Sequence, residues 1–127
     1  MYKEIIITIV IIVLVSIGDF FSQSFTEKNI DEMNIELDEL QKIIEEKDYN
    51  GSKTKINEIG EKWNDKINIM AYYLEHDELE KVTTQLYEIS GYIETGQIDE
   101  CVPFIYNCKF LLNHIKEKEV FNFKNIF

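Results

Sequence analysis

The two histidines are the side chains of this sequence best suited to hold a metal ion. His76 lies between Glu75 and Asp77, and Glu117 follows His114 by three residues. Imidazole and carboxylate groups together are typical zinc ligands, so a site built on His76 and His114 is one hypothesis. The alternative, which we favour, is that His76 ends one helix and His114 packs against or caps another. We therefore expect no metal and no other cofactor.

The two cysteines cannot form a disulfide with each other on a regular helix. Cys101 and Cys108 are seven residues apart. This spacing separates them by about 10.5 Å along a helix axis, whereas a disulfide needs α-carbons within about 7 Å. We interpret both as small buried side chains, with an intermolecular bridge as the alternative.

The sequence contains none of the common catalytic motifs. There is no glycine-rich phosphate loop, nucleophile elbow, metalloprotease histidine pair or kinase signature. The carboxylates are spread around predicted helix faces, and no isolated pair has the buried environment that acid–base catalysis requires. We therefore predict no catalytic residues and a protein that is not an enzyme.

Composition limits both the size of the fold and its partners. The chain has 127 residues and a formal charge of −11, which leaves room for one small domain beyond any anchor. Thirteen cations against 24 acids exclude nucleic-acid binding, because phosphates would be repelled. All the cations are lysine, and the frequent Ile, Asn, Lys and Tyr have AT-rich codons, which indicates an AT-rich bacterial genome.

An uncharged apolar segment runs from Ile5 to Gly18, and Phe20 and Phe21 extend it. This length is at the short limit for crossing a hydrocarbon core of about 30 Å. A buried strand would be shorter and bounded by turn residues. We predict a transmembrane helix with its ends at Ile5 and Phe21, so that residues 1–22 are a membrane anchor and residues 23–127 an acidic helical domain.

Two other interpretations of this segment stay open. Ser16 and Gly18 occupy the −3 and −1 positions of a possible cleavage site before Asp19, as in a secretory signal peptide. The segment would then be removed and the domain secreted. The third interpretation is a buried helix of a soluble protein.

The flanking charges predict the orientation. Lys3 and the amino terminus precede the segment, and no cation follows it before Lys28. The positive-inside rule then favours a cytoplasmic N-terminus and an acidic domain on the outer side. Both leading interpretations of the segment therefore predict export.

Four amphipathic helices are predicted after the anchor, and the first can continue the membrane span. Apolar residues recur at intervals of three and four, which is the period of one helix face. The four faces are Ile30, Met33, Leu37, Leu40 and Ile44; Ile56, Ile59, Trp63, Ile67, Met70 and Leu74; Leu79, Val82, Leu86, Ile89 and Ile93; and Ile98, Cys101, Ile105, Cys108, Leu112 and Ile115. The fold class is all-α, an antiparallel helical bundle or hairpin array. We expect core anchors at Trp63, Ile67, Leu86, Ile105 and Leu112, although Trp63 could also stack on a ligand.

Capping and turn residues predict where the helices end. Residues 48–51, with Asn50-Gly51, are expected to form the first turn. Asp77 with Glu80 fits an N-cap and its reciprocal carboxylate, and Thr95-Gly96 closes the third helix. Asp99 or its neighbours open the last helix, because Pro103 is tolerated only in a first turn.

Two further features concern how the helices pack. Gly60 interrupts the second apolar face, so it permits a close helix crossing or is simply tolerated. Ile44, Glu45 and Ile56 match Ile93, Glu94 and Ile105 at an offset of 49 residues. This weak repeat is typical of helical hairpins that hold a partner segment in a groove.

The end of the chain carries a large apolar load. Phe121, Phe123 and Phe127 lie within seven residues of one another. Antiparallel helices would bring this tail, together with His76 and His114, to the membrane-proximal end. We expect the phenylalanines to pack onto the helices, with insertion at the membrane interface as the alternative.

Several segments together resemble a family of small clostridial-type membrane proteins of unknown function. The resemblance covers nearly the whole chain and is carried by the apolar N-terminal span, Trp63, Leu74–Leu79, Gly91–Glu94, Lys109–Ile115 and Phe121–Phe127. It implies one membrane helix, an all-α remainder, a Gram-positive anaerobe and no assigned activity. The chain departs from the family's pattern at Cys101, Pro103 and Cys108, which puts a special role for these cysteines in doubt.

These observations favour a non-catalytic, single-pass membrane protein whose acidic domain binds or scaffolds another protein, which could itself be a membrane protein. An exported sensor of a ligand or metal that uses the His76 and His114 end is the alternative. A hydrolase of the cell envelope is the least favoured hypothesis.

Overall fold

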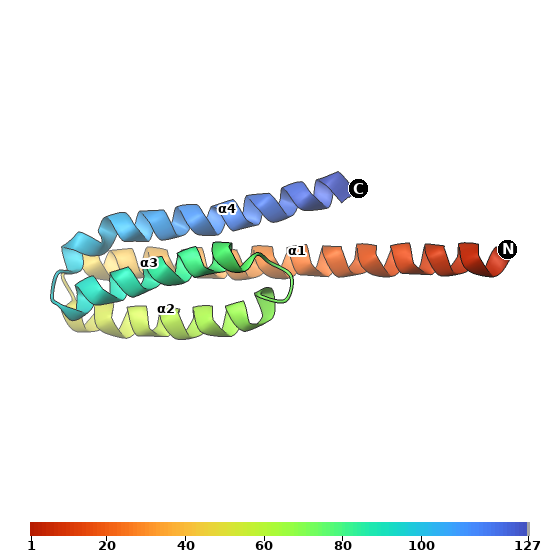
Figure 1. Cartoon of the computed structure of the whole chain (residues 1–127). Helices are drawn as coiled ribbons and strands as arrows, with labels where there is room; N and C mark the ends of the chain where they lie inside the picture. Colours follow the sequence, from red (N-terminus) through yellow and green to blue (C-terminus); the bar gives the residue numbers. More distant parts are fainter. Residues whose placement is uncertain (127) are drawn as a thin grey trace.

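The protein is a bundle of four antiparallel helices, and its first helix extends far beyond the other three (Figure 1). The computed structural model describes residues 1–126, with the side chains of residues 1–121. The helices are α1 (Tyr2–Glu45), α2 (Tyr49–Met70), α3 (His76–Glu94) and α4 (Val102–Ile126), and a short 3₁₀ helix, η1 (Ile98–Cys101), precedes α4. The predictions of an all-α fold and of four packed helices are confirmed.

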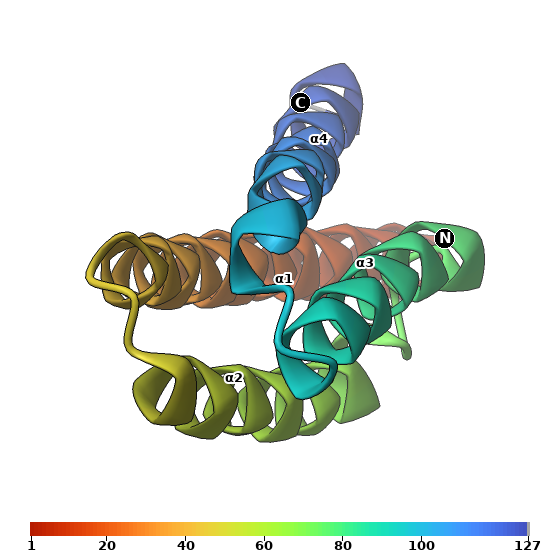
Figure 2. The same cartoon turned by 90° about the vertical axis from the view of Figure 1, so that its left-hand side faces the viewer.

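In Figure 2, α4 lies above α1 and α2 lies below it, with α3 alongside. Helix α1 packs against α2 and α4, and α3 packs against the same two helices. The chain therefore has four seams between neighbouring helices, and consecutive helices run in opposite directions (Figure 1).

The N-terminal apolar segment and the first bundle helix are a single element. Helix α1 runs without a break for 44 residues, and the boundary predicted between residues 22 and 23 falls inside it. Its buried residues begin at Thr26, so only its C-terminal half belongs to the bundle. The absence of proline allows this continuity, and Gly18 is accommodated within the helix.

The core consists of the apolar stripes predicted from the three- and four-residue spacing. Trp63, Leu86, Ile105 and Leu112 are buried, as expected. Ile67 is partly buried and packs against the margin of the core.

The repeat at an offset of 49 residues extends through the whole core. Each buried position of α1 and α2 in the following series has a buried counterpart in α3, η1 or α4. The pairs are Ile30 and Leu79, Met33 and Val82, Leu37 and Leu86, Leu40 and Ile89, Ile44 and Ile93, Ser52 and Cys101, Ile56 and Ile105, Ile59 and Cys108, and Trp63 and Leu112. The bundle is therefore built from two equivalent helical hairpins, α1–α2 and α3–α4.

The two hairpin turns also correspond. Lys47 and Gly96, which are 49 residues apart, both have positive φ, 60° and 78°. Each donates its backbone N–H to a carbonyl three residues earlier, Ile44 in one turn and Ile93 in the other, at 3.0 and 3.1 Å. This is the Schellman geometry that ends many helices. Thr95-Gly96 closes α3 as predicted.

The first turn lies earlier than predicted. Residues 46–48 connect α1 and α2, and Asn50 and Gly51 already belong to α2. The Asp48 side chain caps α2 by accepting a hydrogen bond of 2.8 Å from the Gly51 N–H. A Cβ atom on Gly51 would collide with the Asp48 carboxylate, so this glycine makes room for the cap rather than for the turn.

The start of α3 also differs from the prediction, whereas the start of α4 agrees with it. Glu75 is the N-cap residue of α3 and makes no side-chain capping bond, so Asp77 lies inside the first turn. Asp99 lies in η1, and Pro103 is the second residue of α4, where its missing N–H is tolerated.

Candidate functional site

The apolar end of α1 is exposed on every side. From Ile5 to Phe21 the large apolar side chains point in all directions around the helix, and none packs on the bundle. The segment is long and apolar enough to cross a membrane. Its exposure excludes the interpretation as the buried helix of a soluble fold.

A small polar cluster joins this segment to the bundle. The Tyr73 hydroxyl, in the α2–α3 loop, lies 2.7 Å from the Thr26 hydroxyl and donates to the Ser22 carbonyl at 3.4 Å. Burial, and then the nearby carboxylate of Asp19, raise the pKa of Glu119 on α4. The bundle therefore begins one turn after Phe21.

His76 and His114 lie at the same end of the bundle, as predicted. His76 Nε2 is 2.9 Å from Glu80 Oε1, and His114 Nε2 is 3.9 Å from Glu78 Oε1. Each histidine thus has a carboxylate neighbour of its own. Within residues 1–121, no three histidine, cysteine, aspartate or glutamate side chains are grouped so that they could share a metal ion.

Both cysteines are free and buried. Burial raises the pKa of the Cys101 thiol to about 11 and that of the Cys108 thiol to about 12. Neither side chain is accessible to another molecule, so the interpretation as packing residues holds and the intermolecular bridge does not.

The phenylalanine tail is described only in part. Phe121 is 62% exposed, so it does not pack onto the helices, contrary to the expectation. The side chains of Phe123 and Phe127 lie outside the described residues.

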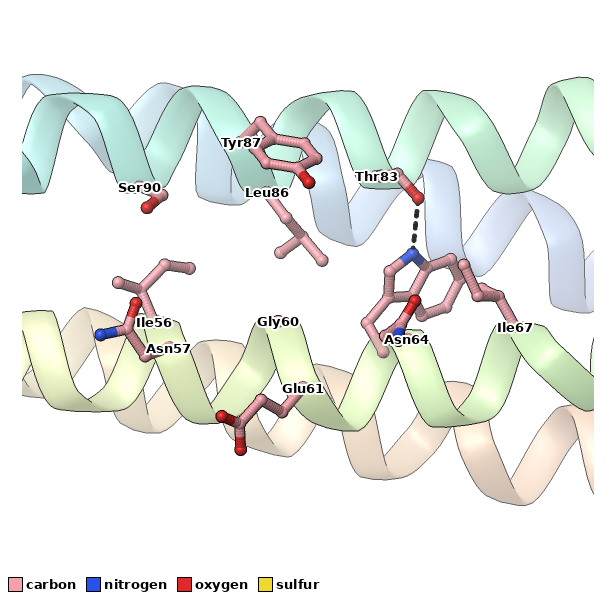
Figure 3. A pocket seen from close by; sticks show the side chains of 11 residues that line it. Ile56, Asn57, Gly60, Glu61, Asn64, Ile67, Thr83, Leu86, Tyr87 and Ser90 are labelled. Carbon is pink, nitrogen blue, oxygen red and sulfur yellow. Dashed lines mark hydrogen bonds between the residues drawn. The ribbon is translucent and has the colours of Figure 1, made fainter.

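A groove of about 560 Å³ lies between α2 and α3 (Figure 3). Its apolar floor comprises Ile56, Trp63, Ile67 and Leu86, and its polar walls comprise Asn57, Glu61, Asn64, Thr83, Tyr87 and Ser90, with Gly60 at the centre of the α2 wall. The indole N–H of Trp63 donates to the Thr83 hydroxyl across the seam at 2.8 Å. A volume in this range is typical of ligand sites.

Gly60 borders the open space of the groove. A Cβ atom at this position would meet no other atom within 4 Å, so of the two alternatives for Gly60 the structure favours a tolerated glycine over a close helix crossing. Figure 3 shows Gly60 facing Leu86 and Tyr87 across the empty space.

The equivalent seam in the repeat, between α4 and α1, is closed by three side-chain pairs. Asn34 donates to Asn113 at 3.0 Å, Gln41 donates to the Tyr106 hydroxyl at 3.3 Å, and Lys109 forms an ion pair with Asp38. At the equivalent positions of the repeat, 49 residues away, the α2–α3 seam has Thr83 and Asn64, Ser90 and Asn57, and Tyr87 and Gly60 in place of these three pairs. The groove thus takes the place of three bonded pairs, with Gly60 in the position of Lys109.

Charge is distributed unequally over α2. The ammonium groups of Lys55 and Lys62 lie 2.6 and 2.8 Å from the Glu36 carboxylate on α1, and together they lower the pKa of Glu36. Glu61, in the groove wall, forms no ion pair with any residue whose side chain is described, and neither does Asp65, which lies one turn further along α2 outside the groove lining. The groove therefore has an acidic rim.

The family model described as a domain of unknown function, DUF4363, matches residues 20–126. The chain belongs to this family. The DUF4363 region starts where the apolar segment ends and includes the complete bundle with its groove. No curated protein and no solved structure matches the chain.

The groove was not predicted from the sequence, although one signal for it was present. The DUF4363 region repeats at 49 residues, and aligning its halves sets Gly60 against Lys109 and Tyr87 against Asp38. An ion pair in one half that is replaced by glycine and tyrosine in the other would have marked the α2–α3 seam as the open one.

Proposed function

We propose that this chain is a single-pass membrane protein whose acidic bundle, on the outer side of the membrane, binds another protein without performing catalysis. The observation that carries the proposal is the exposure of the apolar side chains between Ile5 and Phe21 on all faces of α1. A helix that is apolar all round needs a buried or lipid environment. The bundle does not supply one, so lipid is the environment that fits.

An anchor that stays attached fits the structure better than a cleaved signal. The possible cleavage site after Gly18 lies inside the uninterrupted helix α1, whereas peptidases bind extended chain. The Ser22 carbonyl and the Thr26 hydroxyl, one and two turns later, are already bonded to Tyr73. Continuity of the helix supports a rigid connection between membrane and bundle.

The groove supports binding rather than catalysis. Its eleven lining residues include one carboxylate, Glu61, and no histidine, cysteine or lysine. The two cysteine thiols lie in the core, and burial raises the pKa of each. The groove therefore offers an apolar surface with hydrogen-bonding walls, which is the usual composition of a recognition site.

Membrane fractionation with intact-mass measurement tests the anchor. We expect the full-length mass in the membrane fraction, resistance to alkaline extraction, and digestion of the bundle by protease added outside intact cells. A mature protein that lacks residues 1–18, or a bundle protected from external protease, would contradict the proposal.

Cross-linking in intact membranes tests the binding activity. A photoreactive residue at position 64, in the groove wall, is compared with one at position 88, on α3 outside the groove lining. We expect a defined adduct from position 64 only. Absence of any adduct from several exposed positions would contradict a binding function.

A further inference from the structure

We infer that the α2–α3 groove receives one amphipathic helix of a partner protein, with apolar residues facing the groove and lysine or arginine beside them. The inference rests on the proposed binding function and names the chemistry of the partner. Three features of the groove carry it: the character of its walls, its polar groups and its charge.

Helical walls determine the kind of segment that fits. Both walls are α-helices, so their backbone N–H and C=O groups are already used within α2 and α3. An extended peptide that binds by strand addition would find no free backbone edge here. A helix, in contrast, docks through its side chains, and a two-helix groove is the usual seat for it.

The dimensions agree with a short helix. The lining residues of α2 extend from Ile56 to Ile67, which corresponds to about three turns or 16 Å. Three turns present apolar side chains at positions i, i+3 or i+4, and i+7 of a docked helix. These side chains would cover the floor formed by Ile56, Trp63 and Leu86.

The polar side chains of the groove walls can form hydrogen bonds with a partner. In the closed α1–α4 seam, the equivalent positions bond to each other through Asn34 with Asn113 and Gln41 with Tyr106. Across the α2–α3 seam, Trp63 donates to Thr83 within the groove, and at the turn end Lys53 pairs with Glu94 and the Tyr49 hydroxyl donates to the Glu94 carbonyl, so none of these described interactions uses Asn57 or Asn64. The amides of Asn57 and Asn64 are therefore available for hydrogen bonds to a docked helix.

The rim determines the charge of the partner. Glu58, Glu61 and Asp65 are spaced by three and four residues, so they form one row on α2. Lys55 lies 4.0 Å from Glu58 while it also pairs with Glu36, and Lys62 and Lys66 pair with Glu36 and Glu32 on α1. Among the described side chains, Glu61 and Asp65 are therefore the members of the row without an ion pair. An acidic partner, including a second copy of this chain with its net charge of −11, would be repelled.

Gly60 provides a substitution that fills the groove without disturbing the fold. A Cβ atom here meets no other atom within 4 Å, so Gly60→Leu is sterically accepted and raises helix propensity. Gly91→Leu is the matched control, because Gly91 is also helical, also has open space and does not line the groove. Both variants should melt at or above the temperature of the unmodified chain.

The test uses a defined probe and the full chain in phosphatidylcholine nanodiscs. The probe is a dye-labelled, tryptophan-free helical peptide with leucine on one face and lysine beside it, and its match has glutamate in place of lysine. Affinities are measured by fluorescence anisotropy, with empty nanodiscs as the blank. The emission of Trp63, the sole tryptophan, reports contact with the groove.

We expect the lysine peptide to bind, shift the Trp63 emission and lose at least about tenfold in affinity with Gly60→Leu or with Glu61→Lys and Asp65→Lys together. Gly91→Leu should bind within about twofold of the unmodified chain. The inference is overturned by no binding of the lysine peptide, by equal binding of the glutamate peptide, by unchanged affinity with Gly60→Leu, or by a homodimer that Gly60→Leu dissociates.

These outcomes are separate from those of the proposed function. Peptide binding to a chain that proves to be cleaved after Gly18 would sustain the groove and refute the anchor. A cross-linked partner whose capture is unaffected by Gly60→Leu would sustain the binding function and refute the groove.

Discussion

The two seams that the internal repeat makes equivalent have opposite characters. Between α1 and α4, Lys109 pairs with Asp38, and two amide-based hydrogen bonds reinforce the contact. Between α2 and α3, Gly60 and Tyr87 take the places of that ion pair and leave a groove of about 560 Å³. The same arrangement of buried apolar residues therefore supports either a closed or an open seam. The side chains at its margin decide which one forms.

The largest expected difference between the seams is in the cost of truncating equivalent leucines. Leu37 and Leu86 are counterparts in the repeat, but Leu37 is fully buried whereas Leu86 lies in the groove floor at 5% exposure. Leu37→Ala leaves an enclosed cavity and should cost about 4 kcal/mol of unfolding free energy. Leu86→Ala enlarges a groove that water can enter, so it should cost about 2 kcal/mol. Urea unfolding followed by circular dichroism measures both.

Equal costs for the two leucines would contradict the comparison, because they would mean that the α2–α3 seam is as tightly closed as its counterpart. Leu40→Ala and Ile89→Ala, both at fully buried counterpart positions, serve as controls that should differ little from each other.

A second prediction opens the closed seam. Lys109→Gly copies the residue found at the equivalent position of α2, removes the ion pair with Asp38 and places glycine within α4. We expect a loss of about 1–2 kcal/mol, from helix propensity together with a partly exposed ion pair. Lys109→Ala, which keeps helix propensity, should lose less than about 1 kcal/mol.

The structural readout is as informative as the stability. If side chains at the margin decide whether a seam is open, Lys109→Gly should make the α4 backbone amides near position 109 exchange hydrogen faster. Unchanged exchange there, with stability lost elsewhere, would show that the seam is closed by its core residues alone.

The sequence predicted the helices and the core well because both follow from a single period. Three- and four-residue spacing identifies the buried face of each helix, and all 20 buried apolar residues of the described part of the chain lie on one of the four predicted faces. Period alone does not give the distance between two facing stripes. For this reason the spacing left open whether Gly60 lies at a close crossing or is simply tolerated, and it gave no indication of the open groove that Gly60 borders.

The helix ends were predicted less well, because several residues competed for the same role. Asn50-Gly51 is a dipeptide typical of turns. Asp48, however, is a favourable N-cap residue, so α2 begins directly after it and includes Asn50 and Gly51. The turn then falls on Lys47, a residue with a Cβ atom that is rarely found at φ of 60°. The sequence around Lys47 gave no sign of this conformation.

The third prediction concerns these two equivalent turns. Gly96 adopts its positive φ without strain, so Gly96→Ala should destabilise the bundle by about 1 kcal/mol. Lys47→Gly should stabilise it by up to about 1 kcal/mol, since the exposed ion pair with Asp99 that it removes contributes little. Thermal unfolding of both variants measures the difference. A destabilised Lys47→Gly variant would indicate that the Asp99 pair, rather than backbone strain, dominates at that turn.

The smallest expected effect separates the two flanks of α2 by pH. Lys55 and Lys62 hold the pKa of Glu36 below its usual 4.5, so the folded state binds a proton there less readily than the unfolded state. The stabilisation by the ionised carboxylate is therefore complete above pH 4.5 and is lost as the pH falls through the lowered pKa. Glu36→Gln should remove about 1 kcal/mol or less at neutral pH and flatten the stability profile on the acid side. Glu61→Gln, on the unpaired flank, should leave that profile unchanged. A matching acid-side change in both variants would mean that the groove-side carboxylates are ion-paired too, and the acidic rim that distinguishes the open seam would have to be given up.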